Sequence, residues 1–143
     1  MAGQCSILYI NALTGDDVAE THTGALRALG FDVMETKDIP AARKGLTKYH
    51  ALILRVPEGS RLTVIATRLR AAPRFGRRVL ISLVPEAVTA RRRREAVDSG
   101  FDRVLPAECS ARLLAAAILT ILRRYPEHRC VVRGVWNKRR VVA

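Results

Sequence analysis

Arg55 is the residue whose position in the sequence most suggests chemistry. It follows an unbroken apolar run, 51–54, and precedes a Pro-Glu-Gly turn at 57–59. Such runs are typical of strands buried on both faces of a parallel sheet, and ligands of these sheets bind at the carboxyl ends of the strands. A guanidinium there is permanently protonated, so it can bind an anion or a carboxylate but cannot act as a nucleophile.

Three carboxylates are candidates to pair with Arg55, namely Asp16, Asp17 and Glu58. Asp16 and Asp17 stand at the expected start of a helix, where capping of free amides is their favoured role. The hypothesis is that one of the three pairs with Arg55 and locks the domain in one state. The alternative is a guanidinium that extends into solvent from the strand end, and the sequence favours neither.

The formal charge of +12 is concentrated in two segments. Residues 68–94 hold nine arginines and one acid, and residues 123–143 hold seven basic side chains and one acid. This excess predicts contact with a polyanion, either nucleic acid or an acidic protein, with solvated helix faces as the alternative. The candidate contact residues are Arg74, Arg77, Arg78, Arg91, Arg92, Arg93, Arg94, Arg133, Trp136, Lys138, Arg139 and Arg140.

The C-terminal segment, 126–143, reads as a basic tail to a domain that spans residues 1–125. Its β-rich halves around a Gly/Asn/Lys centre predict a hairpin, an extra strand or a flexible arm that orders on binding. Trp136 among basic residues is a combination that stacks on bases while pairing with phosphates. Docking of Trp136 on the domain is the favoured alternative, because apolar burial needs no partner.

The composition predicts a cytoplasmic globular protein without membrane contact. The chain has 143 residues and 49% apolar content, and its longest apolar run, 113–122, is about half of a membrane span. The N-terminus has no signal-peptide pattern. Three cysteines without a CxxC motif suit reduced thiols. The three histidines lack the spacing of a metal site or a catalytic triad, so we expect no metal, cofactor or catalytic residue. We expect His22 and His50 to be surface or boundary residues.

Strand and helix signals alternate along the chain. Cap residues, prolines and stop glycines delimit five helical segments between and after the apolar runs. This alternation predicts an α/β fold, a (βα)5 doubly wound five-stranded parallel sheet. Strands are expected at 6–10, 31–35, 51–54, 79–84 and 101–105, and helices at 17–29, 38–49, 60–72, 85–97 and 110–122.

Over about residues 5–124 the sequence resembles the receiver domains of two-component response regulators. The best match is 98–106, Asp-Ser-Gly-Phe-Asp-Arg-Val-Leu-Pro, which is similar to the family's segment from the end of helix four through strand five. Shorter matches lie at 7–10, 30–33 and 51–54. The resemblance implies a flavodoxin-like fold and a role in signal transduction. It also implies a contact or dimer face formed by helix four, strand five and helix five, which here includes Arg91–Arg94, Arg103 and Arg112.

The resemblance carries none of the family's phosphorylation chemistry onto this chain. Family members are phosphorylated on an aspartate beside an acidic pair that holds magnesium. A divalent ion requires several oxygen ligands, which the corresponding positions of this chain do not supply. An arginine in place of the aspartate has no nucleophilic oxygen to accept a phosphoryl group. The acidic pair falls at Asn11 and Ala12, the aspartate at Arg55, the switch hydroxyl at Leu83 or, with a one-residue shift, Ser82, and the lysine at Ala107.

These observations predict a pseudo-receiver that is not an enzyme and does not depend on phosphorylation. It would act as a regulatory protein-interaction module in signal transduction or transcriptional control, with a regulatory protein as partner and a homodimer through the same face as one form. The alternative is a protein that binds DNA or RNA through its arginine-rich surface and basic tail.

Overall fold

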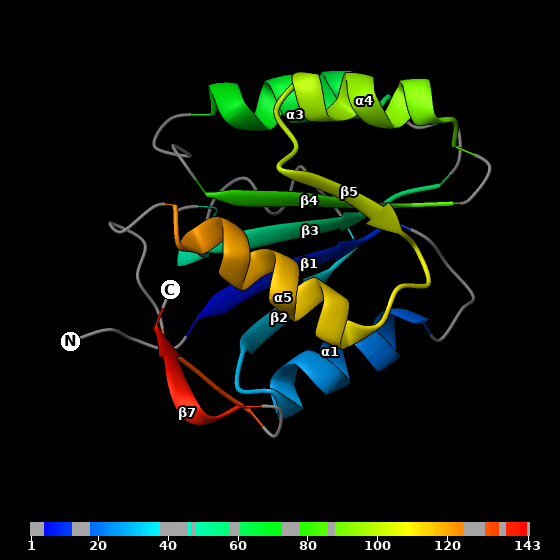
Figure 1. Ribbon diagram of the computed structural model, residues 1–143. Helices are drawn as coiled ribbons and strands as arrows, with labels where there is room; N and C mark the ends of the chain where they lie inside the picture. The colour runs from blue at the N-terminus through cyan, green and yellow to red at the C-terminus, as the bar shows by residue number, and fades with distance from the viewer. Residues whose placement is uncertain are drawn as a thin grey trace.

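The structure, a computed structural model, describes residues 5–12, 18–37, 46, 48–57, 61–72, 78–85, 88–124, 131–134 and 137–142. A five-stranded parallel sheet with strand order β2-β1-β3-β4-β5 forms its centre (Figure 1). This confirms the predicted α/β class and the doubly wound sheet. The strands are β1 (Ser6–Asn11), β2 (Asp32–Thr36), β3 (Ala51–Arg55), β4 (Val79–Val84) and β5 (Arg103–Pro106).

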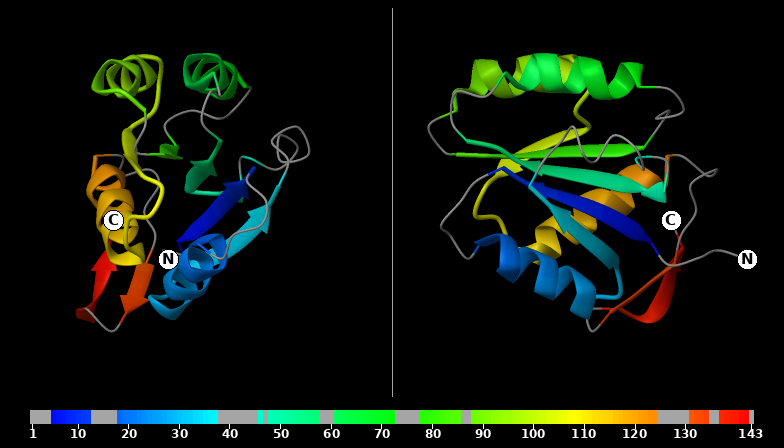
Figure 2. Two further views of the ribbon diagram at one scale, coloured as in Figure 1. Left: turned by 90° about the vertical axis from the view of Figure 1, so that its right-hand side faces the viewer. Right: turned by 180° about the vertical axis from the view of Figure 1, so that it is seen from behind.

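Helices cover both faces of this sheet. Helices α1 (Val18–Ala28) and α5 (Ala111–Leu122) lie on one face, and α3 (Leu62–Ala71) and α4 (Ala90–Asp98) lie on the other (Figures 1 and 2). Each face has its own apolar cluster, one built around α1 and α5 and the other around α3 and α4. Strands β3 and β4 are buried at every position because they lie inside the sheet with helices on both sides, as their unbroken apolar runs predict.

The helix ends follow local capping chemistry, with one correction to the prediction. Ser110 caps α5 as expected, since its Oγ accepts from the Leu113 N–H at 3.1 Å. Helix α4 does not start at residue 85, where a proline suggested the first turn; it begins at Ala90. Thr89 is its cap, and its Oγ accepts from the Arg92 N–H at 3.2 Å. Val88, before the cap, is buried in the α3/α4 cluster and holds the preceding turn against the sheet.

Arg70 on α3 joins three segments at the amino end of β4. Its Nε donates to the Gly100 carbonyl at 2.9 Å, and its terminal nitrogens donate to the Arg78 carbonyl at 2.7 Å and to Asp102 Oδ2 at 2.9 Å. Asp102 Oδ2 also accepts from the Leu80 N–H at 2.8 Å. Gly100 has φ of 134°, and a Cβ there would lie 2.9 Å from Arg70 Cγ, so glycine permits this close approach.

Replacing Arg70 by alanine is expected to lower the free energy of unfolding by about 2–4 kcal/mol, because it removes three hydrogen bonds and leaves a partly buried carboxylate without its cation. Urea denaturation followed by circular dichroism measures the change. The control is Arg68→Ala on the same helix, an exposed position where about 0.5 kcal/mol or less is expected. Equal losses in the two variants would contradict the role given to Arg70.

The C-terminal tail contains two strands, β6 (Val131–Gly134) and β7 (Asn137–Val142). They pair antiparallel, with Val131 opposite Val142, as a two-stranded sheet separate from the five-stranded one. The antiparallel pairing is that of a hairpin, but the connection between the two strands lies outside the described residues, so the tail conformation and the domain boundary at residue 125 stay predictions. The helix expected at 38–49 lies outside the described residues apart from 46, 48 and 49. Within the described part of the chain, no helix is long and apolar enough to cross a membrane.

Candidate functional site

The five positions of the degenerate cleft meet at the carboxyl edge of the sheet. The register places Asn11 of β1 and Leu83 of β4 on either side of Arg55. The Ala12 N–H donates to the Arg55 carbonyl at 2.9 Å, and the Ala107 N–H donates to the Val84 carbonyl at 2.8 Å. Four separate segments of the chain therefore bring their predicted cleft residues to one edge.

Arg55 is buried at this edge. Its residue is only 3% exposed, so the alternative of a guanidinium extended into solvent is wrong. Arg55 alternates with Ala51 and Ile53, which pack in the α1/α5 cluster, and Leu83 belongs to the same cluster. Leu83, not Ser82, is thus the β4 neighbour of Arg55, since Ser82 pairs with Leu54.

The proposed carboxylate partners of Arg55 lie outside the described residues, at Asp16, Asp17 and Glu58. The ion pair that would lock the domain therefore remains a proposal. A buried guanidinium is retained in proteins when charged or polar groups surround it, because an isolated buried charge is costly. The burial of Arg55 supports an internal partner, and it fits no role in phosphoryl transfer.

The five predicted cleft positions, which the structure describes, offer by residue type neither a set of metal ligands nor an activated nucleophile. Asn11 supplies a neutral amide, and the other positions supply aliphatic side chains and a guanidinium. Among the described residues no group of three His, Cys, Asp or Glu side chains is placed to hold a metal ion. Burial raises the pKa of the Cys109 thiol, so at neutral pH it is protonated and a poor nucleophile.

A buried polar network lies on the same face of the sheet. His22 of α1, expected at the surface or a boundary, is 2% exposed, which corrects that expectation. Its Nδ1 lies 2.8 Å from the Tyr9 hydroxyl, and its Nε2 lies 2.6 Å from the Cys109 carbonyl. Because a carbonyl only accepts, a neutral His22 carries its proton on Nε2 and accepts from Tyr9 at Nδ1. The ring thereby ties α1 to the segment between β5 and α5.

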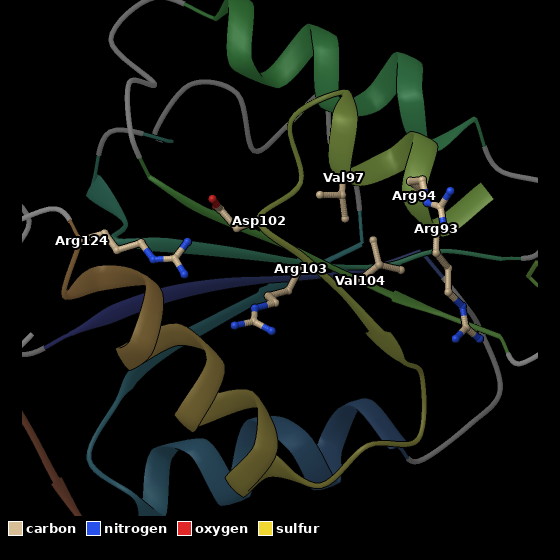
Figure 3. A pocket seen from close by; sticks show the side chains of 7 residues that line it. All are labelled: Arg93, Arg94, Val97, Asp102, Arg103, Val104 and Arg124. Carbon is tan, nitrogen blue, oxygen red and sulfur yellow. The ribbon is translucent and has the colours of Figure 1, made fainter. Parts of the chain in front are cut away.

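A second candidate site is a groove of about 440 Å³ between α4 and α5, across β5 (Figure 3). Four arginines line it, two from α4, one from β5 and one just after α5. Val97 and Val104 point toward one another between them, as Figure 3 shows. We call this the arginine groove; its lining residues are Arg93, Arg94, Val97, Asp102, Arg103, Val104 and Arg124.

The arginine groove divides the residues that the sequence suggested for polyanion binding. Arg93 and Arg94 line it, whereas Arg91 pairs with Glu95 at 3.2 Å and Arg92 is exposed outside it. Arg124 was not among the predicted contact residues, because only the fold places the end of α5 beside β5.

Of the other predicted contact residues, the structure describes Arg78 and the strands that hold four residues of the tail. Arg78 is half-buried, donates from Nε to the Tyr49 carbonyl at 2.9 Å, and has its pKa lowered by burial. Arg74, Arg77 and Trp136 lie outside the described residues. Arg133 belongs to β6, and Lys138, Arg139 and Arg140 belong to β7. The structure therefore assembles part of the first basic segment, together with Arg103 and Arg124, into one surface.

Solved structures of response regulators share this fold. A two-component response regulator from Clostridium difficile matches with a TM-score of 0.69 and 19% identity, over 85% of this chain and 98% of that chain. An orphan response regulator of H. pylori matches with a TM-score of 0.67 and 17% identity, over 86% and 100% of the two chains. An atypical orphan response regulator, described as having a phosphorylation-independent regulatory mechanism, matches with a TM-score of 0.68 and 15% identity, over 84% and 97%.

These matches establish the fold of the chain as that of response-regulator receiver domains, which confirms the resemblance drawn from the sequence. Comparison with protein-family models and with curated protein sequences finds no match. The fold and the cleft residues are therefore the basis for a functional proposal.

Proposed function

We propose that this protein is a phosphorylation-independent pseudo-receiver that regulates a protein partner through its α4–β5–α5 face. The observation that carries the proposal is the register Asn11–Arg55–Leu83 at the carboxyl edge of the sheet, with Arg55 buried. At the positions that correspond to the family's cleft, Arg55 stands in place of the acceptor aspartate, and Asn11 and Ala12 stand in place of the acidic pair that holds magnesium. Regulation then depends on binding and not on a transferred phosphoryl group.

The structural neighbours support a regulatory role. Two of them are orphan response regulators, and one of these is described as acting independently of phosphorylation. In this proposal the chain acts by binding a partner and is not an enzyme. Its interaction surface would be the α4–β5–α5 face, where an open groove lies beside exposed arginines. A homodimer, if the chain forms one, would use the same α4–β5–α5 face.

The second candidate function is binding of DNA or RNA. Residues 88–124 hold eight arginines and four carboxylates, and the tail adds further basic residues. Such an excess attracts phosphate backbones, with an affinity that falls by roughly one decade per decade of salt for each phosphate neutralised. The salt dependence of binding therefore separates the two candidate functions in part, since a phosphate backbone is expected to give the steeper dependence.

Affinity capture from native cytoplasm tests the proposal. The full chain is immobilised and exposed to lysate with and without nuclease, and bound material is eluted in steps of increasing salt. A protein that is retained after nuclease treatment is the expected result. The matched control is the chain truncated after residue 125, which separates capture by the domain from capture by the tail. Recovery of nucleic acid alone, released as the salt concentration is raised, would contradict the proposal and favour the second function.

A further inference from the structure

The rim of the arginine groove carries positive charge that the described part of the domain does not neutralise. Arg94, Arg103 and Arg124 are exposed, and Arg93 is half-buried. None of the four has a carboxylate partner among the described residues. Asp102 is the one acid among the described lining residues, and Arg70 already holds it at 2.9 Å. The rim therefore presents free guanidinium groups, which bind carboxylates with two parallel hydrogen bonds.

The floor of the arginine groove is aliphatic. Val97 is 44% exposed although it is a large apolar residue, and Val104 on β5 is half-buried beside it. Exposed apolar surface ringed by charge is typical of a surface that meets another protein. The volume of about 440 Å³ lies within the range of sites that hold a ligand of a few residues.

We propose that the arginine groove binds an acidic peptide segment of the partner protein. A leucine-like side chain of the segment covers Val97 and Val104, and flanking carboxylates pair with the arginine rim. This inference rests on the proposed function, and it adds the chemistry of the partner.

Nucleic acid fits the arginine groove less well than an acidic peptide. Single strands are held by aromatic side chains on which bases stack, together with cations for the phosphates. No aromatic side chain is among the described residues that line the groove. A segment with acidic and aliphatic side chains can pair with the charged rim and pack on the apolar floor. A phosphate backbone can pair with the rim alone.

The groove is held in shape before any partner arrives. Asp102 accepts from Arg70 and from the Leu80 N–H, so the start of β5 is fixed next to Arg103. On the other side, Thr89 caps α4, the helix that carries Arg93, Arg94 and Val97. A preformed site loses little conformational freedom on binding, so its affinity is reduced less by ordering.

Fluorescence anisotropy with the full chain and a labelled peptide of alternating glutamate and leucine tests the inference. The variant Arg93→Glu with Arg103→Glu is expected to weaken binding at least about tenfold, because two attractive charge pairs become repulsive. The matched control is Arg61→Glu with Arg68→Glu, two exposed positions at and on α3 that lie outside the α4–β5–α5 face; it makes the same change of net charge and is expected to weaken binding less than about threefold. Val97→Ser is expected to weaken binding about fivefold through the loss of apolar contact.

Peptide controls separate charge from apolar contact. Two changed peptides are used, one with glutamine in place of glutamate and one with serine in place of leucine. Each is expected to bind at least severalfold more weakly than the original peptide. Thermal melts of each protein variant confirm that it is folded. Equal losses in the two double variants would overturn the inference. So would tighter binding of an oligothymidine that depends on Arg93 and Arg103, or no binding of the acidic peptide. Those outcomes leave the proposed phosphorylation independence standing, since it is tested separately by phosphoryl labelling.

Discussion

Replacing Arg55 by alanine is expected to lower the free energy of unfolding by about 3–5 kcal/mol. The residue is 3% exposed and stands between Asn11 and Leu83, so its removal leaves a cavity, and the carboxylate that we propose as its partner would lose its cation. Urea denaturation monitored by circular dichroism measures the loss.

The matched control for this prediction is Arg55→Met, which keeps most of the volume and removes the charge. It is expected to cost less than the alanine variant because methionine fills most of the cavity, whereas the proposed carboxylate partner loses its cation in both variants. A loss below about 1 kcal/mol in Arg55→Ala would contradict the role of Arg55 as a packed element of the cleft.

The Arg55→Met variant also serves to identify the partner of Arg55. In double-mutant cycles Arg55→Met is combined in turn with Asp16→Asn, Asp17→Asn and Glu58→Gln. A coupling of about 0.5 kcal/mol or more in one cycle assigns the partner. Additive losses in all three cycles would refute the ion pair that we propose as a lock.

Replacing His22 by alanine is expected to lower the free energy of unfolding by about 3 kcal/mol, the second large effect. The ring is buried, and its loss leaves both the Tyr9 hydroxyl and the Cys109 carbonyl without their hydrogen bonds to it. Thermal and urea unfolding measure the change. Tyr9→Phe, which removes one hydrogen bond and little volume, is expected to cost about 1 kcal/mol.

The control for the His22 prediction is Glu20→Ala, an exposed position on the same helix. It is expected to change stability by about 0.5 kcal/mol or less. A His22→Ala loss no greater than the loss in this control would show that the buried network does not hold α1 to the segment before α5.

The sequence predicted the sheet because its signals are local. The unbroken apolar runs of β3 and β4 imply burial on both faces, and the alternation in β2 implies an edge strand; the structure has both. The start of α4 was placed wrongly because Pro85 mimics a first-turn proline, while the actual cap is Thr89. The two signals are close in sequence, and Val88, between Pro85 and Thr89, is buried in the α3/α4 cluster.

The buried polar groups were not predictable in the same way. His22 is buried because Cys109, 87 residues away in sequence, presents its carbonyl to the ring. Arg103 and Arg124 line the same groove only because α5, which follows β5 in the chain, packs beside it. Composition and periodicity report on a residue's own segment, so contacts between distant segments require the fold.

Incubation of the purified chain with acetyl phosphate and magnesium, followed by intact-mass spectrometry, tests the central claim most directly. The claim is that a receiver fold with Arg55 at its cleft regulates without phosphoryl transfer. We predict no phosphoryl adduct, under conditions in which a receiver domain with an intact acidic cleft is labelled. A stable adduct mapped to an aspartate of this chain would contradict the account.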